Sequence, residues 1–148
     1  MRVLQNAKIP FREHSYDPEI TDGQSVAQAI GTNPDQTFKT LVTVSDGGKF
    51  FVFVTPVTRE LDLKACARTV GVKNISMIPQ KQLLPLTGYV HGGCSPVGMK
   101  KSLPVTFDSS CLQFDEITLS AGKKGRQVSV NPNDLISFLK AKIGDFSV

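Results

Sequence analysis

The stretch TFKTLVTVSDGGKFFVFVT, residues 37–55, carries the strongest local signal in the chain and decides its fold class. Residues 37–45 alternate in polarity, as expected of a strand with one covered face. Asp46-Gly47-Gly48 supplies the positive φ angles of a tight turn, and residues 49–55 return as a second strand. Because this second strand is nearly all apolar, we expect it at the centre of a sheet with both faces covered.

Helices and further strands are predicted on both sides of this hairpin. Glycine, proline, asparagine and aspartate mark their ends. Together they predict one α+β domain over residues 1–148, with a curled, barrel-like mixed sheet and flanking helices. The predicted elements are a strand over 11–16, a helix from a cap at Thr21 or Asp22 to Gly31, a helix over 61–70, a strand over 75–78 with a helical turn to 84, a glycine-rich loop over 89–98, a hairpin over 117–130, and a helix from Asn131-Pro132 to Gly144.

Composition limits the classes of protein to which the chain can belong. It has 148 residues, 40% of them apolar, which suits one domain with a real core. No apolar run approaches the ~20 residues of a membrane span, and the first residues do not resemble a secretory signal. Three widely spaced cysteines form neither a disulfide framework nor a zinc motif. We therefore expect a cytoplasmic protein without metal or cofactor, whose net charge of +4 permits a polyanionic partner.

Lys39 is the first candidate site residue. On the predicted strand it shares a face with Leu41 and Thr43, while Phe38 and Val42 point the other way. A lysine that opens a buried strand can place its ammonium at a cavity mouth, where it could hold a phosphate or a developing negative charge. A lysine that only extends its charge into solvent at a strand end has the same pattern.

The loop over residues 92–98 is the second candidate. Three glycines let its backbone approach a ligand closely, and Ser95 could add a hydroxyl. An ordinary connecting loop fits as well. His91 and Cys94 also permit a nucleophile–base pair, but sequence proximity does not establish that geometry.

Two further features suggest contact with nucleic acid. Lys123, Lys124 and Arg126 lie at a predicted hairpin tip, where cations can position phosphates without reading sequence, although such tips are usually only solvated. Tyr16 could stack on a base. No Ser-His-Asp set, carboxylate pair or HExxH motif is present, so an enzyme of this sequence would not depend on a protein nucleophile.

Five motifs in register resemble the YbaK/EbsC family of bacterial Cys-tRNA(Pro) deacylases, relatives of the editing domain of prolyl-tRNA synthetases. The resemblance covers essentially the whole chain. The motifs are NPDQxxKTL at 33–41, TPV at 55–57, LDLK at 61–64, TGYVxGGxSPxGxKKxLP at 87–104 and SxGKxG at 120–125.

This resemblance implies a mixed α/β editing fold and removal of cysteine from mischarged tRNA(Pro), with Cys-tRNA(Cys) open as a further substrate. In such enzymes the substrate's own thiol attacks its ester, so the protein needs only to position and polarise. The implied partners are the tRNA(Pro) acceptor end and prolyl-tRNA synthetase. The implied roles are Lys39 as the essential lysine at the aminoacyl-adenosine end, Tyr16, Thr40, Gly92, Gly93 and Ser95 as substrate-binding residues, and Lys100, Lys101, Lys123, Lys124 and Arg126 as tRNA contacts.

Two positions depart from the family pattern. Asp22 stands where relatives carry an aromatic residue, and Gln127 stands where an acidic residue often follows the hairpin. Both leave the amino-acid selectivity open. An Ala-tRNA(Pro) hydrolase that activates water, and a non-catalytic module that binds tRNA or a synthetase, remain as alternatives.

Overall fold

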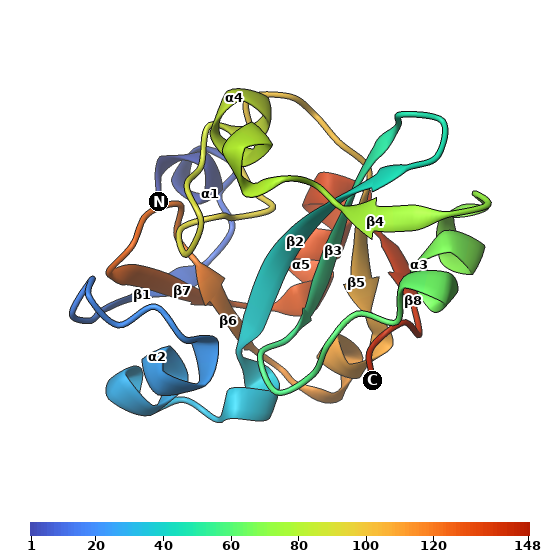
Figure 1. Cartoon of the computed structure of the whole chain (residues 1–148). Coiled ribbons are helices and arrows are strands. Elements are labelled where there is room, and N and C mark those ends of the chain that lie inside the picture. Colours follow the sequence, from blue (N-terminus) through green and yellow to red (C-terminus); the bar gives the residue numbers. More distant parts are fainter.

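The central hairpin is confirmed in the computed structural model, which describes residues 1–148 (Figure 1). β2 (Phe38–Ser45) pairs antiparallel with β3 (Phe50–Pro56), with Lys39 opposite Thr55. β3 is the middle strand of a five-stranded sheet of order β4-β2-β3-β5-β8, and its central side chains are fully buried, as predicted. The other strands of this sheet are β4 (Ile75–Met77), β5 (Val105–Asp108) and β8 (Lys142–Gly144).

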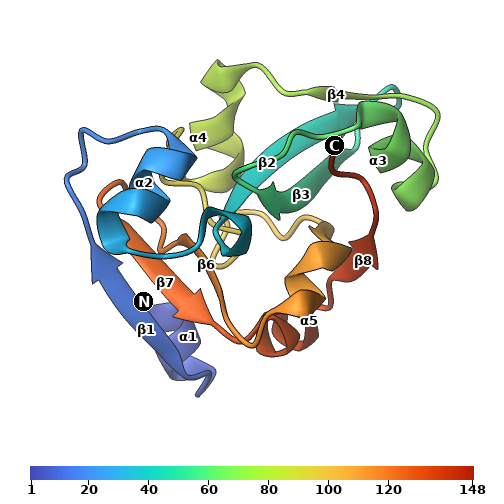
Figure 2. The same ribbon diagram turned by 90° about the horizontal axis from the view of Figure 1, so that it is seen from below.

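A second sheet of three antiparallel strands lies beside the first (Figure 2). Its order is β1-β7-β6, with β1 (Phe11–Ser15), β7 (Arg126–Val130) and β6 (Ile117–Ser120). One isolated parallel bridge, between Thr37 and Thr118, joins it to β2. The expectation of one curled, barrel-like sheet is therefore wrong. Closure needs a continuous ladder between neighbouring strands, and here β6 and β2 separate after a single residue pair.

Capping residues fix the longer helices where the sequence predicts them. Asp22 accepts a hydrogen bond from the Ser25 N–H, and Gly31 ends that helix at φ 76°. Asp62 and Asn131 cap the other two in the same way. The helices are α1 (Arg2–Asn6), α2 (Gly23–Ile30), α3 (Leu63–Val70), α4 (Leu83–Thr87) and α5 (Pro132–Leu139), with 3₁₀ turns η1 (Pro34–Gln36), η2 (Gln80–Gln82) and η3 (Ser109–Gln113).

The last predicted helix is shorter than expected. It ends at Leu139 instead of Gly144 because Lys140 adopts the left-handed conformation at φ 53°. Ile143, which falls within the predicted helix, instead pairs with Phe107 as part of β8 and is 37% exposed. α1 and β5 have no counterpart in the sequence prediction. None of the helices is both long and apolar enough to cross a membrane.

Two apolar cores hold the sheets in place. The larger contains side chains from both sheets, among them Phe38 and Val42 from one face of β2. The smaller lies under α3, where the rings of Phe53 and Phe146 meet edge to face at 5.0 Å. α3 and β4 lie at one end of the molecule, whereas α1, α2 and α4 gather around the smaller sheet (Figure 1, Figure 2).

Phe146 offers a direct test of the smaller core. Its side chain is 1% exposed, whereas that of Phe138 is 42% exposed. We expect Phe146→Ala to lower the free energy of unfolding by about 3–5 kcal/mol, because it removes a buried ring and leaves a cavity. The matched control Phe138→Ala should cost less than about 1 kcal/mol. Urea denaturation of both variants checks this, and equal losses would contradict the assignment of Phe146 to the core.

Candidate functional site

A cavity of about 570 Å³ opens where the two sheets separate. Beyond the Thr37–Thr118 bridge, β2 has no strand partner on that edge until β4 pairs with it at Thr43. The wedge between the free edge of β2 and the ends of β6 and β7 forms this cavity. Its lining residues come from the segment before α2 and its first turn, the first half of β2, the segment after β3, the β4–α4 segment, the loop after α4, and the neighbouring ends of β6 and β7: Tyr16, Thr21, Asp22, Gly23, Gln24, Val26, Thr37, Phe38, Lys39, Thr40, Leu41, Val42, Val57, Glu60, Met77, Ile78, Gln80, Leu83, His91, Gly92, Cys94, Ser120 and Gln127.

Lys39 lines the cavity together with two acidic residues, Glu60 and Asp22. Its ammonium lies 3.3 Å from Oε1 of Glu60, whose side chain is 79% exposed. Asp22 also lines the cavity, and its pKa is lowered mainly by hydrogen bonds from Ser25, with a smaller contribution from the charge of Lys39. An exposed ion pair of this kind contributes little stability, so an incoming phosphate or carbonyl oxygen can replace Glu60 at the ammonium. Sequence reasoning missed Glu60, because nothing in its sequence context separates it from any exposed glutamate.

Of the three residues of the glycine-rich loop that were predicted to bind substrate, Gly92, Gly93 and Ser95, only Gly92 lines the cavity. Gly92 lines the cavity at φ 87°. Gly93 is packed on the β6–β7 hairpin: a Cβ there would lie 3.1 Å from the Lys123 Cα. Ser95 is fully buried and does not line the cavity, and its hydroxyl accepts from the Val97 N–H at 3.1 Å. The structure thus places Gly92 at the cavity, whereas Gly93 and Ser95 make contacts that hold the loop in place.

Tyr16 and Thr40 also line the cavity. Tyr16 is half-buried, and its N–H donates to the Gly125 carbonyl at 3.0 Å, which ties it to the β6–β7 hairpin. Thr40 is 9% exposed on the free edge of β2. Gln127, which departs from the family pattern, also lines the cavity and is 7% exposed.

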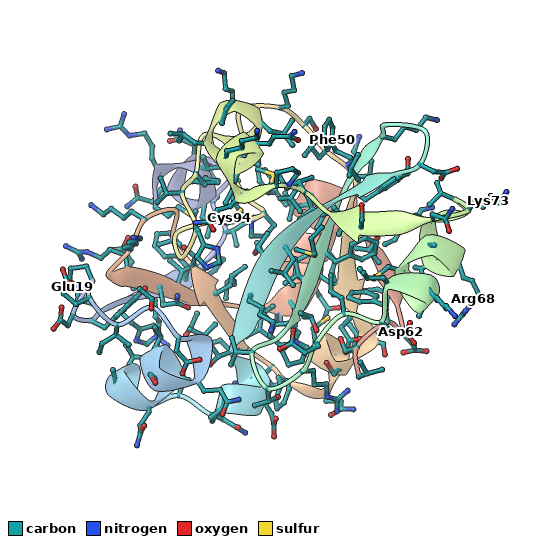
Figure 3. The ribbon with its side chains drawn as sticks, viewed as in Figure 1. Glu19, Phe50, Asp62, Arg68, Lys73 and Cys94 are labelled. Carbon is teal, nitrogen blue, oxygen red and sulfur yellow. The ribbon has the colours of Figure 1, made fainter.

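Cys94 and His91 both line the cavity, but no hydrogen bond joins them. Burial raises the pKa of the Cys94 thiol to about 12, so only about one thiol in 10⁵ is ionised at pH 7. Figure 3 places Cys94 inside the molecule, in the loop after α4. Burial likewise raises the pKa of Cys66 to about 12 and of Cys111 to about 11, and neither lines the cavity. An unionised thiol is a poor nucleophile, so none of the three suits that role.

The five predicted tRNA-contacting cations are all exposed, and none belongs to any of the three ion pairs of the structure. The hairpin tip contacts the glycine-rich loop, because the Lys124 side chain lies 3.6 Å from the position of a Gly92 Cβ, and Lys100 and Lys101 follow that loop in the sequence. Arg126 and Lys123 also contribute to lowering the pKa of Glu13, so part of this charge faces β1. The cations concerned are Lys100, Lys101, Lys123, Lys124 and Arg126.

Comparison with known proteins identifies relatives over most of the chain. The sequence profile of the aminoacyl-tRNA editing domain family matches residues 17–138. EbsC of Enterococcus faecalis, whose name gives a proposed Cys-tRNA(Pro)/Cys-tRNA(Cys) deacylase activity, is 36% identical over 99% of this chain and 91% of its own. A proline–tRNA ligase of Shouchella clausii is 28% identical over 78% of this chain and 20% of its own length. A crystal structure described as a proposed trans-editing enzyme for prolyl-tRNA synthetase superposes with a TM-score of 0.86, at 25% identity over 99% of this chain and 93% of its own.

The raised pKa of Cys94 predicts how the native protein reacts with iodoacetamide. Because the thiolate is the reactive form, the alkylation rate of Cys94 should rise about tenfold per pH unit from pH 7 to pH 10 without a plateau. Mass spectrometry of the Cys94 peptide after timed alkylation measures this rate. A plateau between pH 6 and pH 8 would instead show an activated thiolate and return Cys94 to the nucleophile role.

Proposed function

The chain belongs to the aminoacyl-tRNA editing domain family, and from this premise we propose that it is a trans-editing deacylase that clears cysteine from mischarged tRNA(Pro). The observation that carries the proposal is a cavity with a lysine and a glycine backbone among its lining residues, but no activated nucleophile. A protein of this design can bind and orient an ester whose own side chain reacts. Cys-tRNA(Cys) is a further candidate substrate, and a prolyl-tRNA synthetase is a candidate partner.

In the proposed reaction, the cysteine thiol of the substrate attacks its own ester carbonyl carbon. The bond from that carbon to the ribose oxygen breaks, the thiol proton ends on the ribose oxygen, and the products are a cyclic thiolactone and free tRNA. The attack is intramolecular, and effective molarities of such reactions can reach ~10⁵ M or more. The role left for the protein is to hold the ester in a reactive geometry and to stabilise the developing negative charge.

Lys39 is proposed as the residue that binds this end of the substrate. Its ammonium would leave Glu60 for an oxygen of the terminal adenosine or of the ester. Tyr16, Thr40 and Gly92 would complete the pocket, and Gly93 and Ser95 would act by holding the loop in place. The cations of the two basic loops would contact the tRNA phosphates.

A substrate panel tests the proposed function. The protein is incubated with tRNA(Pro) that carries cysteine, alanine, serine or proline, and loss of the aminoacyl group is followed. We expect rapid loss of cysteine, slower loss of serine because a hydroxyl is a weaker nucleophile, and nearly intact alanine and proline esters. Preferential loss of alanine would support the hydrolase alternative. Binding without deacylation of any ester would support the non-catalytic alternative.

Lys39→Ala should lower the deacylation rate of Cys-tRNA(Pro) by about 10²-fold or more, on the scale of removing an oxyanion-hole donor. The fold should survive, because the side chain contributes only an exposed ion pair. Lys49→Ala is the matched control, since Lys49 is exposed near the turn of the same hairpin. Single-turnover rates and melting temperatures of both variants are compared. Near-native turnover of the Lys39 variant would remove this lysine from the site.

Replacing Lys123, Lys124 and Arg126 together with alanine should weaken tRNA binding to a similar extent for different tRNAs. The dependence of log Kd on log salt should become flatter by up to about 0.9 for each phosphate that the variant no longer neutralises. A control variant replaces three exposed cations around α3: Lys64, and Arg68 and Lys73, which are labelled in Figure 3. A salt slope unchanged in the first variant, or reduced equally in both, would contradict a specific role for the hairpin tip.

A further inference from the structure

Two residues that line the cavity each carry a buried polar side-chain atom without a hydrogen-bond partner: Thr40 its Oγ1 and Gln127 its Oε1. Their residues are 9% and 7% exposed. Buried polar groups in folded proteins are almost always hydrogen-bonded, because an unpaired one costs free energy. An unpaired polar group in a cavity-lining residue therefore indicates a place where a ligand supplies the missing hydrogen-bond partner.

The neighbours of Gln127 show that this exception is local. Ser129 lies two residues along β7 on the same face, and its hydroxyl is bonded to Thr118 at 2.6 Å and to His14 at 2.7 Å. On this face of β7 the Ser129 hydroxyl therefore has hydrogen-bond partners, and the unpaired atom is that of Gln127, which lines the cavity. Thr40 lies on the edge of β2 that has no strand partner, so the two oxygens belong to the two sheets that bound the cavity.

We propose that Gln127, together with Thr40, binds the α-amino group of the aminoacyl ester, and that the enzyme therefore requires a substrate with a free amino group. The inference rests on the proposed function. Oε1 of Gln127 can only accept a hydrogen bond. Among the groups of the aminoacyl-ribose, the ester carbonyl offers no donor, the thiol is a weak donor, and the free ribose hydroxyl carries one. The α-amino group offers several donors on one atom, of which one would pair with Gln127 and another with Thr40.

This arrangement has a consequence for substrate choice. The Gln127 amide and the Thr40 hydroxyl would recognise the amino group through hydrogen bonds. A site that forms hydrogen bonds to one group of its substrate discriminates strongly against analogues that lack this group. N-acylated esters, including peptidyl-tRNA, lose donors at this atom and gain bulk beside Gln127. The proposed subsite would thus confine the enzyme to aminoacyl-tRNA and spare growing peptide chains.

The test uses substrates that differ only in the amino group. Cysteinyl-tRNA(Pro) is compared with 3-mercaptopropionyl-tRNA(Pro), which keeps the thiol and the ester. In parallel, calorimetry compares binding of 3′-alanylamino- and 3′-propionylamino-3′-deoxyadenosine, which cannot be cleaved. The variants are Gln127→Met, which removes the acceptor, Gln127→Glu, which keeps one, and the control Ser129→Ala, a buried polar residue on the same face that does not line the cavity.

We expect wild type to prefer the amino compound by about tenfold or more in both assays, the scale of one hydrogen bond to a charged group. In Gln127→Met this preference should collapse to about twofold or less while the melting temperature does not fall, because an unpaired buried atom has been removed. Gln127→Glu and Ser129→Ala should keep the preference. Differences in intrinsic ester reactivity cancel because the ratios are compared between variants.

Three results would overturn the inference. The first is equal binding of the two adenosine compounds by wild type, and the second is a Gln127→Met variant that keeps the preference. The third is a Gln127→Met variant that loses activity on both esters equally and has a lower melting temperature, which indicates a structural role. Failure to deacylate cysteinyl-tRNA(Pro), with the binding preference intact, would count against the proposed function alone.

Discussion

The contact on which the site depends is the bridge between Thr37 and Thr118, where the two sheets meet along one residue pair and then separate. A longer ladder would have closed the sheets and filled the wedge between them. Because β6 and β2 separate after this pair, the first half of β2 keeps a free edge, and Lys39 and Thr40 face an open cavity instead of another strand. The glycine-rich loop completes the cavity because Gly93 lets it pack directly on the backbone of the β6–β7 hairpin.

In the same cavity, the charged side chains are separate from the buried neutral ones. Lys39, Glu60 and Asp22 form the charged part of the lining, whereas the buried groups around it are neutral: an unionised Cys94 thiol, the Thr40 hydroxyl and the Gln127 amide. An environment of this kind suits an ester that brings its own nucleophile, because the protein supplies orientation and a cation without a competing reactive group. It also explains how one small domain can edit with few residues of conventional catalytic type.

Local signals in the sequence predicted the local structure well. The hairpin of residues 37–55 follows from alternation and an Asp-Gly turn, and Asp22 and Asn131 cap helices as expected. Lys39 could be placed at a cavity from strand alternation and the family resemblance together. Features that depend on distant partners could not be predicted. Whether the sheets close is a matter of long-range register, β8 exists only because β5 lies beside it, and the burial of Ser95 or the unpaired oxygen of Gln127 depends on neighbours far along the chain.

The central claim is that the reacting thiol belongs to the substrate, and one comparison tests it most directly. Wild-type protein is given cysteinyl-tRNA(Pro) and S-methylcysteinyl-tRNA(Pro) under single-turnover conditions, so that the two esters differ only by a methyl group on sulfur. Deacylation of the methylated ester should fall to the uncatalysed background while its binding to the protein persists. Comparable deacylation of both esters would contradict the account, because the nucleophile would then be a water molecule or a group of the protein.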